Sequence, residues 1–276
     1  MVATTASRRR SVPKRILSYT GELWKRREFA IYLGFGSFSA KNATTALGLI
    51  WWVLNPLLLG GVYFLIFGLI FGNRTSDFLV YLMAGMFVFQ FSAQALSGGA
   101  HSIIQNAKLL ENIRFPRLIL PISKIVESAI GFVASLGVLV IIALFVGESV
   151  LNGPLWILLI AFPMQVMFNV GLAAFGARLA VPFRDITNVI PYFTRIWLYL
   201  SPIIWTLDRL EGMGDTVLFF VELNPMYHLL ALYRAGLLGY PLDWANAGQF
   251  AISMAIVFLL GVGMFVRYEK FIVRDL

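Results

Sequence analysis

The charged residues inside the apolar stretches of the sequence are the first candidates for chemistry. Glu127 is the one carboxylate well inside such a stretch, and Arg195 is the one cation. Ionisable side chains at membrane depth commonly mark a path for an ion or a substrate. Lys124 precedes Glu127 by three residues, so these two side chains either form a local ion pair on one helix face or hold an ion.

The usual residues of catalysis and metal binding are missing. The chain has no cysteine, and its two histidines, His101 and His228, are far apart, so the sequence predicts no metal site. No glycine is followed by lysine, which excludes a P-loop for nucleotides. The sequence also has no acidic cluster that could hold a metal diphosphate. We therefore expect no catalytic residue, no cofactor in this chain, and no enzyme activity of the chain by itself.

The elements that carry these residues are long and apolar. Of 276 residues, 59% are hydrophobic and 13% are charged, and the mean hydropathy is +0.80. Soluble domains carry about 25% charged residues, and a helix needs about 20 apolar residues to cross a bilayer. The sequence predicts an all-α membrane protein with six transmembrane helices. These are 49–71, 78–98, 118–146, 155–180, 187–206 and 247–266.

A seventh apolar region, 216–240, is interrupted by Asn224-Pro225, Arg234 and other polar residues. We expect this region to be re-entrant or interfacial, within an outer segment of about 207–245. The chain thus divides into a basic arm, 1–48, and a membrane domain, 49–276.

The positive charges are distributed unevenly along the chain. The net charge is +8, and most Lys and Arg residues lie in the arm, in the second and fourth connections and after the last span. Cytoplasmic connections carry an excess of Lys and Arg. Both termini of this multi-pass protein are therefore predicted to be cytoplasmic.

Within the arm, apolar pairs recur every seven residues, at 16/17, 23/24 and 30/31. This pattern predicts an amphipathic helix in the membrane interface, with its cations near anionic lipid headgroups. The residues at its centre are Leu23, Trp24, Lys25, Arg26 and Arg27. Nucleic-acid binding is the alternative for such a basic run, but the membrane interpretation already accounts for it, and we expect no nucleic-acid partner.

Aromatic residues are abundant, with 24 Phe, 10 Tyr and 7 Trp. They are compatible with anchoring belts at the membrane surface or with a pore whose rings stack on sugars. In the second span, three phenylalanines alternate around Gln90 and Gln94. The candidate pore residues are Trp51, Trp52, Phe87, Phe89, Gln90, Phe91, Gln94, Trp197 and Tyr199.

Five segments carry a resemblance to a known family. They are LGLIWWVLNPLL at 47–58, NAKLLENIRFPR at 106–117, PFRDI at 182–186, SPI at 201–203, and LNPM at 223–226 followed by Arg234. In this order they resemble the polysaccharide-exporter branch of the ABC-2 permeases, over nearly the whole chain. Within that branch, the alanine- and arginine-rich start and the overall sequence are most similar to the galactan exporters of mycobacteria and their relatives.

The resemblance implies a channel-forming subunit in the bacterial inner membrane, with a type V exporter fold and short outer gate helices. It also implies a homodimer with two copies of a separate P-loop ATPase, which would bind Mg-ATP. The implied cargo is a polysaccharide on a polyprenyl diphosphate lipid, either a cell-wall galactan or an O-antigen-like chain, exported from the cytoplasm.

By position, the resemblance makes the loop at about 99–117 the coupling element that docks onto the ATPase. Its contact residues would be Lys108, Leu109, Leu110, Ile113, Arg114 and Phe115. An ordinary interfacial loop is the alternative. Arg184 either forms an ion pair with Asp185 or contacts the diphosphate of the lipid.

Two other function classes are open at this point. One is an exporter of the same fold for a drug or a small lipid. The other is a polyprenol-dependent membrane glycosyltransferase or phosphotransferase, which the missing acidic cluster disfavours.

Overall fold

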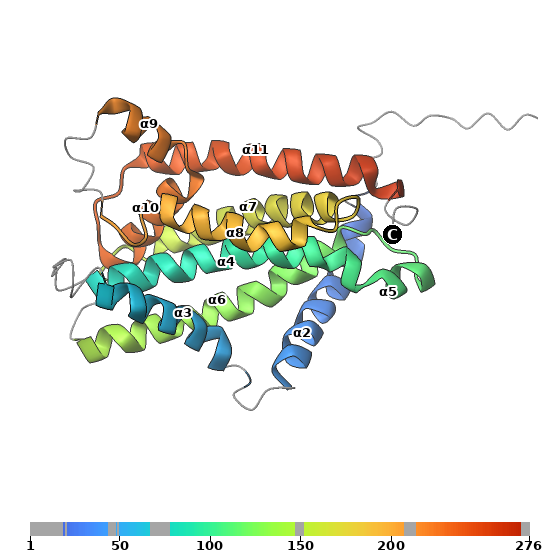
Figure 1. Cartoon of the computed structure of the whole chain (residues 1–276), viewed down its shortest axis with the longest axis horizontal. Helices are drawn as coiled ribbons and strands as arrows, with labels where there is room; N and C mark the ends of the chain where they lie inside the picture. Colours follow the sequence, from blue (N-terminus) through green and yellow to red (C-terminus); the bar gives the residue numbers. More distant parts are fainter. Residues whose placement is uncertain are drawn as a thin grey trace, which may run out of the picture.

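The computed structural model describes residues 19, 21–43, 48, 50–66, 78–146, 152–206 and 214–271. This part of the chain forms a bundle of helices (Figure 1). The helices are α2 (Arg27–Ala43), α3 (Ile50–Tyr63), α4 (Phe78–Gln105), α5 (Ala107–Asn112), α6 (Ile119–Val146), α7 (Trp156–Ala180), α8 (Ile186–Leu200), α9 (Asp215–Glu222), α10 (Pro225–Leu238), α11 (Trp244–Tyr268) and the 3-10 helix η3 (Glu269–Phe271).

Four of these helices, α4, α6, α7 and α11, are long and apolar enough to cross a membrane. Each has at least 25 residues, which gives a length of about 38 Å or more. The pair α9 and α10 reaches that length only together, and it is bent by 71°. The predicted first and fifth spans contain α3 and α8, of 14 and 15 residues. The structure therefore supports four spans, or five, among the described residues, and the six-span count stays a prediction.

Helix α4 forms the centre of the bundle and packs against α6 and α7, while α11 packs on the far side of α7 (Figure 1). The packing is close because small residues meet at the crossings. A Cβ atom on Gly99 of α4 would collide with the backbone of Ala173 in α7, and one on Gly261 of α11 would collide with the backbone of Gly171. These glycines therefore set the distances between α4, α7 and α11.

Basic residues gather at one end of the bundle, which we call the basic end. It is formed by α5, by the start of α2, α6 and α8, and by the end of α4, α7 and α11, at the right of Figure 1. The described cations there are Lys25, Arg26, Arg27, Lys108, Arg114, Arg117, Arg178, Arg184 and Arg267. The opposite end holds α9 and α10, with the acidic residues Glu222 and Asp243.

Asn224 forms the joint between α9 and α10. Its side-chain oxygen caps α10 by accepting from the Met226 N–H at 3.1 Å, and Pro225 occupies the first turn, where it needs no N–H partner. The same oxygen accepts from Nε1 of Trp197, at 3.0 Å, and the amide Nδ2 donates to Ser201 Oγ, also at 3.0 Å. Asn224 therefore holds the bend between α9 and α10 and joins it to the end of α8.

Candidate functional site

One face of α4 is polar although the rest of the helix is apolar and buried. Five polar side chains recur at spacings of three or four residues, which places them on one side of a helix. They are Gln90, Gln94, Ser97, His101 and Gln105. A row of this kind gives a polar surface along half of a membrane-length helix.

This polar face lines a cavity of about 400 Å³ between α3, α4 and α6, within the usual size range of ligand sites. Helix α6 contributes Lys124, Glu127 and Ser128 to the wall, and α3 contributes Asn55. All of its lining residues except Gly98 carry a polar side chain. The arrangement can therefore bind a polar ligand through many hydrogen bonds inside an apolar bundle.

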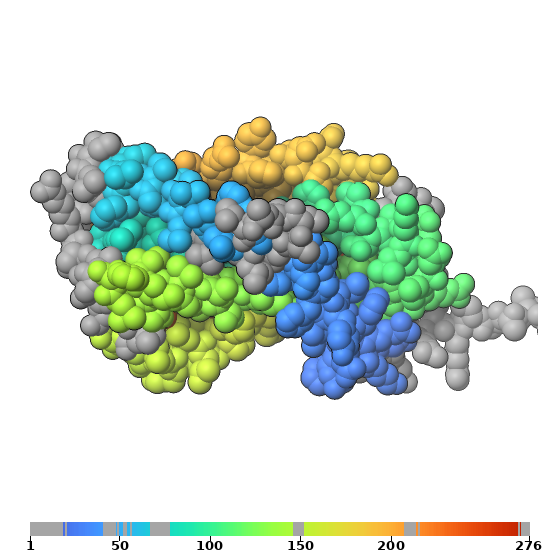
Figure 2. Space-filling view, turned by 90° about the horizontal axis from the view of Figure 1, so that it is seen from below, coloured from blue at the N-terminus to red at the C-terminus, as the bar shows by residue number. Residues whose placement is uncertain are grey.

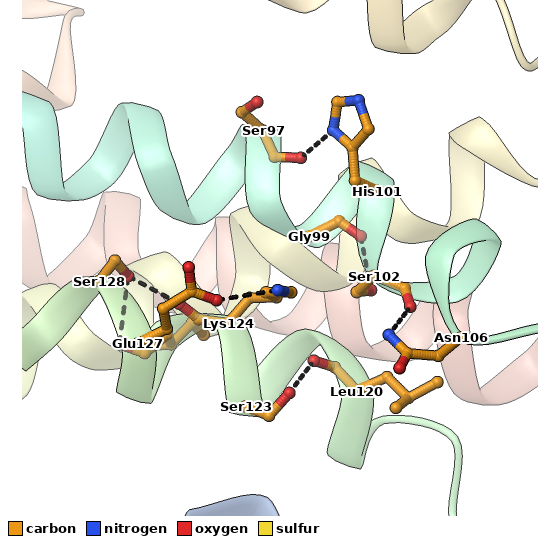
Figure 3. A network of polar contacts seen from close by, with 11 residues as sticks. Ser97, Gly99, His101, Ser102, Asn106, Leu120, Ser123, Lys124, Glu127 and Ser128 are labelled. Atoms are coloured by element: carbon orange, nitrogen blue, oxygen red, sulfur yellow. Dashed lines mark hydrogen bonds and ion pairs between the residues drawn. The ribbon is translucent and has the colours of Figure 1, made fainter. Parts of the chain in front are cut away.

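Lys124 and Glu127 form an ion pair in this wall. The Lys124 Nζ lies 2.8 Å from Oε2 of Glu127, and their side chains are 16% and 7% exposed. Figure 3 shows the pair beside Ser128, whose hydroxyl donates to the Lys124 carbonyl at 2.9 Å. The local ion pair, one of the two alternatives for these residues, is therefore present.

His101 is oriented by its own helix. Its Nδ1 lies 2.8 Å from the carbonyl oxygen of Ser97, one turn earlier (Figure 3). Because a carbonyl only accepts, Nδ1 carries the proton in this bond. The other ring nitrogen, Nε2, is then the atom through which His101 can interact with a ligand in the cavity.

The structure separates the pore candidates of the second span. Gln90 and Gln94 line the cavity. Phe87, Phe89 and Phe91 are only 2%, 4% and 1% exposed, so they belong to the subunit core, where Phe91 stacks on Phe132 at 5.0 Å. Alternation along a helix does not place residues on one face, although Phe87 and Phe91 do border a small pocket beside Gln90 and Gln94. The place of these phenylalanines in a pore stays a prediction.

The other pore candidates lie in different surroundings. Tyr199 is half exposed at the end of α8 and lies 3.2 Å from Tyr63, hydroxyl to hydroxyl. Trp197 is partly buried, with its ring 5.3 Å from that of Phe89. Trp51 is exposed on α3, and Arg184 is exposed in the connection between α7 and α8. The Trp52 side chain lies outside the described residues.

Helix α8 turns a mostly apolar face away from the bundle, with the exposed Arg195 at its edge. The exposed side chains of this face recur every three or four residues, at Val189, Tyr192, Phe193, Ile196, Tyr199 and Leu200. Contacts to the rest of the chain come from the other face, where Ile190 and Leu198 are buried. The outer face of α8 is thus available to lipid or to a second protein.

The predicted coupling loop divides into an exposed tip and a buried base. Lys108, Ile113 and Arg114 are exposed at the tip. Leu109, Leu110 and Phe115 instead pack into an apolar cluster with Ile103 and Leu118 of this chain. Leu110 is buried within this chain, whereas Leu109 and Phe115 are only partly buried, and the contact of all six side chains with a partner stays a prediction.

The base of this loop is held by contacts with α2 and with the residue just before it. The Phe115 ring meets the Phe29 ring of α2 edge to face, at 5.3 Å, and Arg26 donates to the carbonyl oxygen of Arg114 at 3.1 Å.

The residues predicted for the interfacial helix differ in exposure. Trp24, which is 70% exposed, is covered on one face by the Arg27 guanidinium at 4.7 Å. Lys25 is also exposed and Leu23 packs partly inward. The placement of this segment in the membrane interface stays a prediction. In Figure 2, α2 lies against the basic end, beside α5.

A second set of hydrogen bonds, which we call the Tyr19–Arg117–Glu269 clamp, joins three segments that are far apart in the sequence. The Arg117 N–H donates to Oε1 of Glu269 at 2.7 Å, the Arg117 guanidinium donates to the Glu269 carbonyl, and the Tyr19 hydroxyl accepts from the Leu118 N–H at 3.4 Å. Burial raises the pKa of Glu269, with the Arg117 N–H opposing it, and burial also raises the pKa of Tyr19. Sequence reasoning missed this cluster because its members are 99 and 152 residues apart.

Comparisons with known proteins agree with this architecture. A family model described as ABC-2 type transporter matches residues 37–238. An O-antigen export system permease protein, RfbA, of Myxococcus xanthus is 28% identical over 218 residues, covering 78% of this chain and 82% of that protein. A protein of the same name from Klebsiella pneumoniae is 23% identical over 226 residues, covering 82% and 86%. With its several apolar helices of membrane-spanning length, the chain is a multi-pass membrane protein that belongs to the ABC-2 type transporter family.

Proposed function

We propose that this chain is the channel-forming transmembrane subunit of an exporter that moves a lipid-linked polysaccharide out of the cytoplasm. The observation that carries the proposal is the polar face of α4, which gives an apolar bundle a row of amides, hydroxyls and an imidazole. Such groups replace the hydrogen bonds that a sugar chain loses when it leaves water. Similarity to two O-antigen export permeases supports a polysaccharide cargo, and the resemblance to galactan exporters supports a polyprenyl diphosphate carrier.

The channel forms between two copies of this chain. The outer face of α8 supports this arrangement, because it exposes Tyr192 to 67% and Phe193 to 52%. Aromatic side chains are typical of protein interfaces. In the dimer, α3 and α8 complete the six spans, and α9 and α10 act as gate helices at the outer side.

A separate P-loop ATPase, in two copies, drives transport by binding Mg-ATP. The exposed tip of the coupling loop, with Lys108, Ile113 and Arg114, is its docking surface, and the two cations steer an acidic partner into place. The protein lies in the bacterial inner membrane. Because cations gather at its basic end, that end faces the cytoplasm, and both termini are cytoplasmic.

The test is to tag the chain, purify it from native membranes in mild detergent, and measure what is bound. A P-loop ATPase in a one-to-one ratio, together with ATP-dependent export of a lipid-linked glycan by the reconstituted complex, is the expected result. A stable preparation without any ATPase would contradict the proposal. Export of a drug or a short lipid in place of the glycan would keep the exporter class and reject the cargo. Glycosyl or phosphoryl transfer by the chain alone would reject the exporter class.

A further inference from the structure

We propose that the cavity between α3, α4 and α6 binds a phosphate group, with Lys124 as its charged ligand and Glu127 as the counter-ion in the empty state. Under the proposed function, this phosphate belongs to the carrier lipid of the cargo. The binding chemistry is the same for a lipid headgroup and for free diphosphate, and the experiment below distinguishes them.

The depth of the cavity suits a headgroup. Lys124 lies five residues after the start of α6, and His101 lies four residues before the end of α4. At 1.5 Å per residue, these groups are about 6–8 Å from the basic end of their helices. A lipid phosphate can reach this depth while its hydrocarbon chain stays in the bilayer.

The cavity is rich in donors for phosphate oxygens. Side-chain amides of Gln90, Gln94 and Asn55 line it together with the Ser97 hydroxyl and the Lys124 ammonium. Phosphate oxygens only accept, and hydrogen bonds from a charged donor are about twice as strong as neutral ones. The cavity therefore combines one strong cationic contact with several neutral donors.

The Lys124 side chain has room to exchange the Glu127 carboxylate for a phosphate. A Cβ atom on Gly98 of α4 would lie 3.3 Å from the Lys124 Cβ, so the glycine gives the lysine stem room to lie along α4. The stem is flexible and its ammonium is a compact charge. A membrane-depth ion pair contributes little net stability, because desolvation offsets its attraction. A stabilising role alone thus explains the pair poorly, whereas a ligand-exchange role explains why a lysine lies there.

Glu127 gives this inference a distinctive consequence. Its carboxylate holds the Lys124 ammonium at 2.8 Å, so it competes with any phosphate for the same cation and repels it as well. Replacing the carboxylate by a neutral amide, Glu127→Gln, should therefore tighten phosphate binding by about tenfold, the equivalent of one charge-assisted hydrogen bond. A merely structural ion pair would give no such gain.

The experiment uses the absence of cysteine from the chain. Ser97→Cys places a single thiol on the cavity wall, and Ser92→Cys, at a fully buried position of the same helix, is the matched control. The full-length chain in lipid nanodiscs is treated with a charged methanethiosulfonate reagent, alone and with farnesyl diphosphate, farnesol or inorganic pyrophosphate. The rate of thiol modification is the readout.

Farnesyl diphosphate should slow modification of the Ser97→Cys variant in a saturable way and farnesol should not. Protection by pyrophosphate as well would show that free diphosphate also binds, whereas protection by farnesyl diphosphate alone would assign the site to a lipid headgroup. Lys124→Gln should abolish protection, and Glu127→Gln should shift half-protection to about tenfold lower concentration. Since the two variants act in opposite directions, misfolding cannot explain both. Equal protection by farnesol, or no protection at all, overturns the inference.

The result is separable from the proposed function. If the complex exports its glycan but farnesyl diphosphate gives no protection, the cavity assignment fails and the exporter stands. If protection is seen but no ATPase co-purifies, the phosphate site stands and the exporter fails.

Discussion

The ring of Phe115, after α5, contacts the ring of Phe29 in α2 edge to face, with centroids 5.3 Å apart and an interplanar angle of 79°. This contact joins the base of the predicted coupling loop to α2. Movement of the tip of α5 would therefore reach α2 directly, as well as α4 and α6.

The first prediction concerns that pair. Phe29→Ala and Phe115→Ala should each lower the unfolding free energy, and the double variant should lose less than their sum. The difference should be about 0.5–1.5 kcal/mol, the range measured for aromatic pairs. Thermal unfolding of the unchanged chain, the two single variants and the double variant in one detergent measures this difference. Strictly additive losses would show that the rings do not interact.

The second prediction separates docking from transmission in this loop. Ile113→Asp changes the exposed tip and should weaken binding of the ATPase. Phe115→Asp puts a charge into the base, where Phe115 packs against Phe29, so it should leave the ATPase bound while export per ATP hydrolysed falls. Pull-down and coupled export assays measure the two effects, and loss of ATPase binding in both variants would contradict the division.

The third prediction is a pH dependence at the basic end. Burial raises the pKa of Glu269 above that of an exposed glutamate, so folding favours its protonated form. Its contribution to stability is full at low pH and is lost as pH rises through the raised value. Unfolding midpoints measured over a series of pH values should therefore fall as the pH is raised above the ordinary pKa of a glutamate. Glu269→Gln should remove this trend, and Glu28→Gln, at an exposed carboxylate, should keep it.

How far the sequence could predict this molecule depends on the range of each interaction. Helices α4, α6, α7 and α11 follow from apolar length alone, and the Lys124–Glu127 pair follows from helical spacing. Phe87 and Gln90 differ in role only because of the helices that pack around α4, which no local pattern reveals. The Tyr19–Arg117–Glu269 clamp joins segments that no short motif connects, so it required the folded chain.

The fourth prediction concerns the joint at Asn224, which contacts α8 through Trp197 and Ser201 and also caps α10. Asn224→Ala should destabilise the chain more than Asp243→Ala, since Asp243 caps α11 through the Ala245 N–H. Loss of a cap costs about 1 kcal/mol, and each further hydrogen bond lost adds about 0.5–1.5 kcal/mol. The unfolding midpoints of the two variants measure which of them is less stable. Equal shifts would mean that the contacts to α8 contribute nothing.

The last prediction tests the second copy. In a cysteine-free chain, Phe193→Cys places one thiol on the outer face of α8, and Leu259→Cys places one on α11, at side chains that are 52% and 67% exposed. If α8 faces its counterpart in a homodimer, a short bifunctional maleimide should cross-link the Phe193→Cys variant into dimers within native membranes. The Leu259→Cys variant, whose exposed face meets lipid, should stay monomeric on the gel. Both thiols are open in a single subunit, so the difference between the variants reports the interface rather than exposure. Cross-linking of the α11 variant with none of the α8 variant would move the dimer contact from α8 to α11.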